Sequence, residues 1–218
     1  KSRNNKMFSF IKGEAENATR ELAVERGPCP DGASAGVRNA HLLAVAPNAS
    51  SSIICGNTSP SIEPYRANAF TQKTKSGSSL LKNEYLEHAL QEIGQDTDDV
   101  WKSIITNGGS VQHLEFLDDY TKDVFKTAVE IDQRWVIEMA ADRQEKICQS
   151  QSLNIFFPSN VSKQELHAIH MMAWKKKVKT LYYLRSEASK RAETVSDEAL
   201  RQYIFDSIDD EGCLACEG

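Results

Sequence analysis

The sequence predicts an α/β fold in which short buried strands alternate with helices. Three apolar runs carry this prediction, at residues 42–46, 153–157 and 178–183, and helical patterns lie between them. Such runs are typical of strands buried on both faces of a parallel or mixed sheet, and strand–helix–strand order favours right-handed crossovers. The 218 residues are enough to bury one substantial core or two small ones.

The first half of the chain predicts helices with recognisable ends. Gly27 is placed to end the first helix, and Asn83 and Thr97 are suited to capping the N-termini of two later ones. The expected elements are helices at 7–26, 48–54, 84–93 and 98–106, an extended segment at 65–74, and breaks at 27–38 and 107–109.

The second half predicts one long amphipathic helix over residues 118–147, followed by a strand, a helix and a strand. The long helix is inferred from apolar residues at helical spacing, namely Val124, Ala128, Ile131, Trp135 and Met139. Ser162 with Glu165 three residues later forms a capping-box pattern for a helix that ends at about Lys176. Residues 185–218 are polar and poorly periodic, which predicts a mostly flexible tail.

Charge and cysteine content exclude several classes of protein. The formal net charge of −5 argues against a nonspecific nucleic-acid binder, and no apolar run approaches the length of a membrane span. Of the five cysteines, Cys29, Cys55 and Cys148 are isolated, so a secreted disulfide framework is not expected. We therefore predict a cytoplasmic protein, with Cys55 and Cys148 as small core hydrophobes and Cys29 in a structural role.

Asn48, Ala49, Ser50 and Ser51 follow the first apolar run, where the next helix is expected to begin. Free backbone N–H groups at a helix N-terminus bind anions, and small hydroxylated residues let a phosphate approach closely. This segment is a candidate phosphate-binding site, with an ordinary serine-rich helix start as the alternative.

Tyr182 and Tyr183 are adjacent phenols at the end of the last apolar run. Successive residues of a strand point to opposite faces, so a core requires only one of them. Phenols are oxidisable, and two in contact could relay an electron together with its proton. The alternative is one packed ring and one surface phenol.

Cys213 and Cys216 form a Cys-x-x-Cys pair near the end of the sequence. Two thiols at this spacing can close a disulfide or bind a metal, but structural zinc requires four ligands. His167 and His170 would share one helical face, where a satisfied, partly buried histidine pair is the expected interpretation. A redox dithiol on a mobile tail suits the position better, because it can exchange with an external reductant. No metal ligands are predicted.

Motifs in a fixed order along nearly the whole chain resemble the C-terminal part of the large, catalytic subunit of class I ribonucleotide reductase. The matching motifs are Pro47-Asn48-Ala49-Ser50-Ser51, Gly56-Asn57, Ser61-Ile62-Glu63-Pro64-Tyr65, Asn107-Gly108-Gly109-Ser110-Val111-Gln112, Gln149-Ser150-Gln151-Ser152-Leu153-Asn154-Ile155, Lys179-Thr180-Leu181-Tyr182-Tyr183-Leu184-Arg185 and Cys213-Leu214-Ala215-Cys216. The resemblance implies the latter part of the family's ten-stranded α/β barrel for residues 1–184, and a tail ending in a redox pair for 185–218.

The resemblance also implies roles for the candidate residues. The segment Asn48 to Ser51 would bind the diphosphate of a ribonucleoside diphosphate substrate. Tyr182 and Tyr183 would pass a radical from the small subunit towards the active-site cysteine. Cys213 and Cys216 would re-reduce the active-site disulfide and be recharged by thioredoxin or glutaredoxin.

Several parts of the family's machinery have no match in this sequence. The radical-forming cysteine and the two reducing cysteines lie upstream of the matched region, as does the segment that binds ATP and deoxynucleotide effectors. An N-terminal part of the large subunit would have to supply them. No cofactor is expected on this portion, since the tyrosyl radical and its metal belong to the small subunit. Lys177 stands where the family commonly has Gly; if its φ is positive, the cost is on the order of 1 kcal/mol.

Two functions from other classes remain as alternatives. The chain could be a non-catalytic scaffold or regulatory protein that binds the small subunit without turnover. It could also be a redox or zinc module built on the Cys-x-x-Cys pair, in which case zinc would bind stoichiometrically and be lost on Cys213→Ser.

Overall fold

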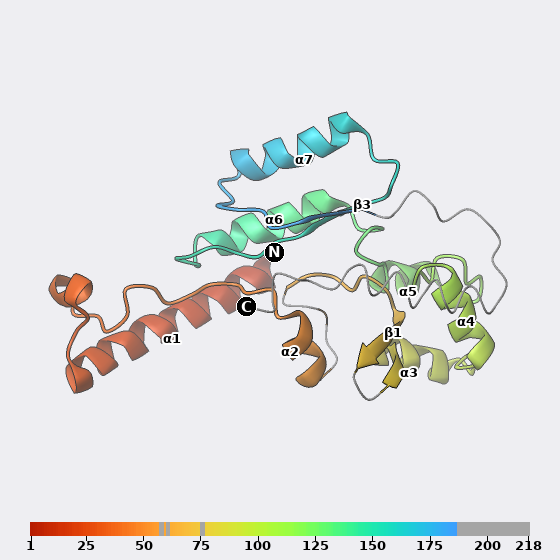
Figure 1. Cartoon of the computed structure of the whole chain (residues 1–218), viewed down its shortest axis with the longest axis horizontal. Helices are drawn as coiled ribbons and strands as arrows, with labels where there is room; N and C mark the ends of the chain where they lie inside the picture. The colour runs from red at the N-terminus through yellow and green to blue at the C-terminus, as the bar shows by residue number, and fades with distance from the viewer. Residues whose placement is uncertain (57–58, 60–61, 75–76, 187–218) are drawn as a thin grey trace. The chain divides into compact units, whose positions relative to one another are not determined.

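The structure is a computed structural model that describes residues 1–56, 59, 62–74 and 77–186 (Figure 1). In chain order its elements are α1 (Ser2–Arg26), η1 (Pro30–Ala35), α2 (Ala49–Ile54), β1 (Ala69–Thr74), β2 (Gly77–Lys82), α3 (Glu84–Glu92), α4 (Asp98–Thr106), α5 (Asp119–Val124), α6 (Gln133–Gln144), β3 (Ile155–Phe157), α7 (Lys163–Lys175) and β4 (Leu184–Ser186).

The described chain divides into two compact units. Unit 1 combines residues 1–64 with residues 131–186, and unit 2 consists of residues 65–130. Each unit has a hydrophobic core of its own. The candidate phosphate-binding segment and the tyrosine pair both belong to unit 1.

Short parallel pairings form the centre of unit 1. β3 pairs in parallel with β4, and Val45 forms a parallel bridge with Gln151. The Val45 N–H donates to the Ser150 carbonyl (3.1 Å), and the Ser152 N–H donates to the Val45 carbonyl (2.8 Å). Residues 150–157 therefore have one parallel neighbour at Val45 and another at β4, which confirms the predicted parallel arrangement.

Two of the predicted strands are shorter than expected. In the run 42–46 only Val45 makes a bridge, and Pro47, which lacks an N–H donor, follows two residues later. The last strand begins at Leu184 instead of residue 178. Directly before it, the Tyr183 N–H donates to the side-chain oxygen of Asn154 (3.0 Å), so the regular backbone ladder is interrupted at this point.

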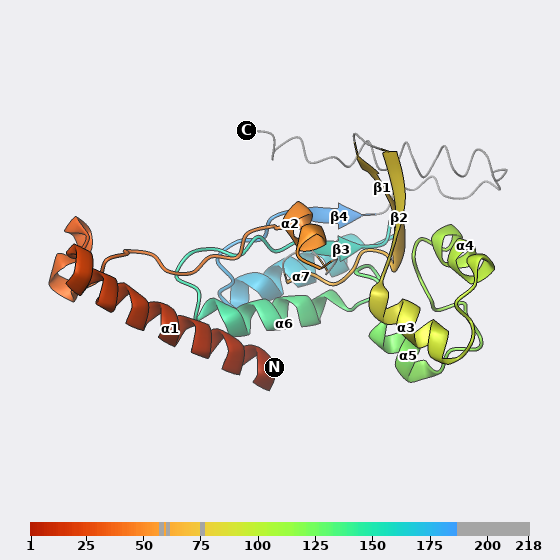
Figure 2. The same ribbon diagram turned by 90° about the horizontal axis from the view of Figure 1, so that it is seen from below.

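α6 is the central helix of unit 1, in contact with α1, α7 and β3 (Figures 1 and 2). Its buried side chains join those of β3 and α7 in one apolar cluster, made of Ile137, Ala140, Leu153, Ile155, Phe157, Ile169 and Ala173. α7 begins as predicted, because the Ser162 hydroxyl accepts the N–H of Glu165 (3.0 Å). α1 begins earlier than predicted, at Ser2, and ends as predicted before Gly27, whose φ is 80°.

Unit 2 combines the antiparallel hairpin of β1 and β2 with helices α3, α4 and α5. Asn83 and Thr97 cap α3 and α4 through their side-chain oxygens, so both predicted helices are confirmed. The predicted break at 107–109 is also confirmed. A side chain at Gly109 would lie 2.3 Å from the Cβ of Ala67, and the φ of this glycine is 82°. β2 was not among the predicted elements.

The predicted helix over residues 118–147 is wrong, because the chain forms two separate helices there. α5 ends at Val124 and α6 begins at Gln133. Between them, the Glu130 carboxylate accepts hydrogen bonds from the N–H (2.8 Å) and the hydroxyl (2.9 Å) of Thr127. Asp132 then caps α6 with its side chain. These local side-chain bonds replace the helical pattern that the apolar spacing indicated.

Candidate functional site

Tyr182 and Tyr183 lie in contact along the last described segment of unit 1. Their ring centroids are 4.2 Å apart and their planes are inclined by 53°. The Tyr182 N–H donates to the Leu153 carbonyl (2.8 Å), and the Tyr183 carbonyl accepts the N–H of Ile155 (3.0 Å). Adjacent side chains of a regular strand diverge, but these two precede the ladder of β4. Their rings can therefore meet.

The backbone of Tyr183 is fixed by a short chain of hydrogen bonds. Asn154 accepts the Tyr183 N–H through its side-chain oxygen (3.0 Å). The Asn154 N–H donates in turn to the buried carboxylate of Glu63 (3.0 Å). Glu63 belongs to the Ser61-Ile62-Glu63-Pro64-Tyr65 motif. The motif thus positions the second tyrosine, a role that the sequence alone did not indicate.

Arg185 covers the ring of Tyr183 from β4. Its guanidinium carbon lies 4.6 Å from the ring centroid, within the range of a cation–π contact. The Arg185 Nε is buried, and no hydrogen-bond partner for it lies among the described residues. The phenol ring of Tyr183 is thus in contact with both a cation and the ring of Tyr182.

Lys179 anchors the start of the tyrosine segment to the loop that follows α6. Its ammonium group donates to the carbonyls of Ile147 (3.2 Å), Cys148 (2.6 Å) and Gln149 (3.1 Å). Its N–H also donates to the side-chain oxygen of Gln144 (3.3 Å). Three carbonyls that point at one ammonium group hold the loop and the tyrosine segment together.

A buried polar network supports the same loop from inside. Gln151 donates through its amide to the Ala140 carbonyl (2.9 Å) and accepts from the guanidinium of Arg143 (3.1 Å). Burial lowers the pKa of Arg143 to about 10. A buried guanidinium is costly without partners, so Gln151 contributes to the stability of α6 as well as to the position of the loop.

Asn48 opens α2 in a left-handed backbone conformation, with φ 50° and ψ 32°. The Asn48 carbonyl accepts the N–H of Ser52 (3.1 Å), and the Asn48 side-chain oxygen lies 3.5 Å from the hydroxyl of Ser51. The predicted short helix is therefore confirmed, and Ala49, Ser50 and Ser51 form its first turn. The first N–H groups of a helix have no carbonyl within the helix to bind. A phosphate role for this turn stays a prediction.

Other predicted positions differ from expectation or lie outside the description. Cys55 and Cys148 are exposed, so their prediction as core hydrophobes is wrong, because each lies just beyond a helix and not on its buried face. His167 and His170 are both exposed on α7, so the expected partly buried pair is also wrong. Cys213 and Cys216, with the whole predicted tail, fall outside the described residues.

The described residues present neither a metal-binding cluster nor a membrane-spanning helix. Within the described ranges, no group of three or more His, Cys, Asp or Glu side chains gathers where it could hold a metal ion. Helices in the same part of the chain are all too short or too polar to cross a membrane.

Comparisons with known proteins agree on one family. The family model described as ribonucleotide reductase, barrel domain, matches residues 30–184. A putative ribonucleoside-diphosphate reductase large subunit of Frog virus 3 (isolate Goorha) is 46% identical over 212 residues, covering 97% of this chain and 36% of that protein. The large subunit of Invertebrate iridescent virus 6 is 48% identical over 194 residues, covering 87% of this chain and 20% of that protein.

A solved structure adds the likeness in three dimensions. The class Id ribonucleotide reductase alpha subunit of Actinobacillus ureae is 40% identical and superimposes with a TM-score of 0.78, over 86% of this chain and 34% of that chain. The chain thus spans well under two thirds of the length of each of these relatives.

Proposed function

The chain belongs to the ribonucleotide reductase family, and we propose that it contributes to the radical-based reduction of ribonucleoside diphosphates to deoxyribonucleoside diphosphates. Its fold is a portion of the family's α/β barrel domain. The relatives named above are large subunits of ribonucleoside-diphosphate reductase. The chain would act as one part of such a subunit.

The contact of Tyr182 with Tyr183 is the observation that carries this proposal. An electron passes readily between rings whose centroids lie 4.2 Å apart. In each step of the proposed relay, one phenol gives up an electron and its proton and the neighbouring phenoxyl radical takes up both. The Asn154 and Arg185 contacts support the proposal because they restrict how Tyr183 can move relative to Tyr182.

The first turn of α2 would bind the substrate diphosphate. Val45 lies in a parallel pairing, and α2 begins four residues later. In α/β sheets, ligands bind beyond the carboxyl ends of parallel strands. Backbone N–H groups of residues 49–51 and the hydroxyl of Ser51 are donors of the kind that phosphate oxygens accept.

The remaining chemistry would come from partners and from the tail. An N-terminal part of the large subunit would supply the active-site thiols and the effector sites, and a small subunit would supply the radical and its metal. Cys213 and Cys216 would reduce the active-site disulfide by thiol–disulfide exchange and be recharged by thioredoxin or glutaredoxin.

Reconstitution tests the proposal. The chain is mixed with an upstream large-subunit piece, a radical-bearing small subunit and a reductant, and the formation of deoxyribonucleoside diphosphate is measured. Tyr183→Phe should abolish product, because a phenyl ring cannot be oxidised at biological potentials. Tyr120→Phe is the matched control, since Tyr120 is exposed on α5 in unit 2, and it should keep full activity.

The choice of reductant in this assay distinguishes the role of the tail cysteines from that of the tyrosine relay. Cys213→Ser should lose activity when thioredoxin is the reductant and retain it with a small dithiol that reaches the active site directly. If the verified, folded assembly forms no product at all, the chain is either an inactive fragment or a scaffold without turnover, and the roles assigned to its residues are refuted.

A further inference from the structure

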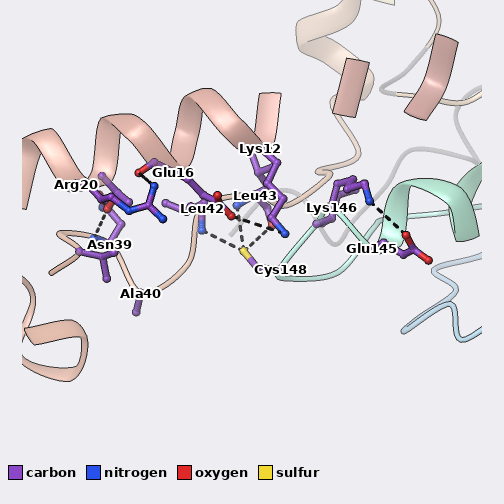
Figure 3. A pocket seen from close by; sticks show the side chains of 13 residues that line it. Lys12, Glu16, Arg20, Asn39, Ala40, Leu42, Leu43, Glu145, Lys146 and Cys148 are labelled. Carbon is purple, nitrogen blue, oxygen red and sulfur yellow. Dashed lines mark hydrogen bonds and ion pairs between the residues drawn. The ribbon is translucent and has the colours of Figure 1, made fainter. Parts of the chain in front are cut away.

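A pocket of about 330 Å³ lies in unit 1 between α1, the segment 37–43 and the loop that follows α6 (Figure 3). Segment 37–43 ends six residues before α2 begins, and the Cys148 carbonyl accepts from Lys179 of the tyrosine segment (2.6 Å). Its wall combines the thiol of Cys148 with five charged side chains, which are Lys12, Glu16, Arg20, Glu145 and Lys146. A pocket of this size admits a small peptide-like molecule.

The thiol of Cys148 is exposed at this pocket and is held by backbone groups. The N–H groups of Leu42 and Leu43 both point to its Sγ, at 3.1 and 3.2 Å (Figure 3). Burial raises the pKa of Cys148, but hydrogen bonds with the backbone of Leu43, Leu42, Gln149 and Cys148 itself together outweigh this effect, and the pKa is lowered overall. A neutral thiol at this position donates to the Leu43 carbonyl (3.3 Å), whereas the two N–H donors aimed at the sulfur favour the thiolate, which is the nucleophilic form.

The charged side chains leave the pocket wall with an excess of positive charge. Lys12 pairs with Glu16 (3.7 Å), and Lys146 pairs with Glu145 (3.3 Å). Arg20 adds a third cation, whose guanidinium donates to the carbonyl of Glu16 (3.4 Å) and not to its carboxylate. Three cations against two carboxylates favour a ligand that carries its own carboxylates.

We propose that Cys148 is a site of mixed-disulfide formation with a small disulfide that bears carboxylates. The Cys148 thiolate attacks one sulfur of the disulfide, and a new sulfur–sulfur bond forms at Cys148. The original sulfur–sulfur bond breaks, and the second sulfur leaves with the bonding electron pair and takes up a proton. Cys148 is oxidised and the leaving half is reduced, so no further oxidant is required. The pocket would hold the bound half through Arg20 and Lys12.

A comparison of the reaction rates of two disulfides of opposite charge tests this proposal. The full chain, with both tail cysteines changed to serine so that they cannot reverse the reaction, is treated with oxidised glutathione or with cystamine. Adducts are located by mass spectrometry after acid quenching. With oxidised glutathione near neutral pH, Cys148 should react faster than Cys55, since thiolate content rises more than nucleophilicity falls as the pKa drops.

Cys55 is the matched control because it is also an exposed cysteine, at the end of α2 and away from the pocket lining. Cys148→Ser should remove the fast adduct, and Cys55→Ser should leave it unchanged. Arg20→Gln should slow the glutathione reaction at Cys148 by about threefold or less and should not slow the cystamine reaction. Circular dichroism verifies that each variant is folded.

Two results would overturn the proposal. One is equal reaction rates at Cys148 and Cys55 in the folded chain. The other is a ratio of glutathione rate to cystamine rate at Cys148 no higher than the same ratio at Cys55, because the positive wall would then exert no selection. Neither readout depends on reductase activity, so this test and the test of the proposed function can fail separately.

Discussion

Lys177 holds the backbone conformation that ends α7, and a residue with a side chain rarely adopts it. Its φ is 60°. The Val178 N–H donates to the Ala173 carbonyl (3.1 Å), and the Lys177 N–H donates to the Trp174 carbonyl (3.0 Å). These two bonds form a Schellman motif, whose left-handed position is usually occupied by glycine. The conformation is thus set by the end of the helix, and lysine fills the position under strain.

Replacing Lys177 with glycine should therefore stabilise the chain. We expect Lys177→Gly to raise the free energy of unfolding by about 0.5–1 kcal/mol, because the relief of backbone strain exceeds the added freedom of the unfolded chain. Urea denaturation followed by circular dichroism measures the change. Ala168→Gly, at an exposed position inside α7, is the control and should cost about 1 kcal/mol. A Lys177→Gly variant less stable than the parent would contradict this account.

At the scale of single residues, the sequence predicts what depends on near neighbours. The caps formed by Asn83, Thr97 and Ser162 were predictable because each side chain bonds an N–H two or three residues later. The exposure of Cys148 and the Glu63–Asn154 hydrogen bond were not predictable, because both depend on how segments far apart in the sequence pack together. A candidate site can thus be recognised from motifs, whereas its supporting contacts require the structure.

Among the elements of unit 1, Glu138 joins three helices. Its carboxylate on α6 accepts from Lys176 at the end of α7 and from Lys1 beside α1. The hydrogen bonds from Lys1 and Lys176 lower the pKa of Glu138 below its ordinary value of 4.5. A carboxyl group whose pKa is lowered by folding stabilises the folded state at pH values above its ordinary pKa. This contribution is lost as the pH falls through the pKa of the folded state.

The pH dependence of stability should reveal this contribution. Glu138→Gln should be less stable than the parent at neutral pH, and the difference should shrink as pH falls below about 4.5, since the parent's carboxylate then becomes protonated. Urea midpoints measured from neutral pH down to about pH 3 test this expectation. Glu145→Gln is the control, because its carboxylate is largely exposed, and it should change the midpoints little at any pH. A Glu138→Gln difference that stayed constant with pH would refute the assignment.

The failed prediction of a long helix shows why element boundaries are harder to predict than element types. Ala128 is fully buried, whereas Val124 and Trp135 of the same predicted stripe are 55% and 56% exposed. Apolar spacing alone cannot distinguish one helix from two whose faces point differently. The break depends on Thr127 and Glu130, which bond each other locally. The predicted parallel order of the apolar runs was correct because topology rules limit the alternatives.

For the whole molecule, the two units each bury their own core. Unit 2 is built around an apolar cluster of Ala69, Leu86, Leu90, Trp101, Ile104, Val111, Leu114 and Leu117. The cluster of unit 1 shares no residue with it. Part of a barrel domain can therefore bury substantial cores even though the chain spans only 36% of its Frog virus 3 relative. The tyrosine segment depends on the core of unit 1, through β3 and α6.

Core truncations in the two units should therefore act locally. Leu90→Ala and Ile137→Ala each remove a fully buried side chain and should each cost about 2–5 kcal/mol. Hydrogen exchange followed by mass spectrometry should show that Leu90→Ala lowers protection mainly within residues 65–130, and Ile137→Ala mainly within 131–186 and α1. In the double variant the losses should add, because sites without shared partners are independent. Loss of protection across both units from either single change would instead mean that the units unfold as one, and that the tyrosine segment depends on both cores.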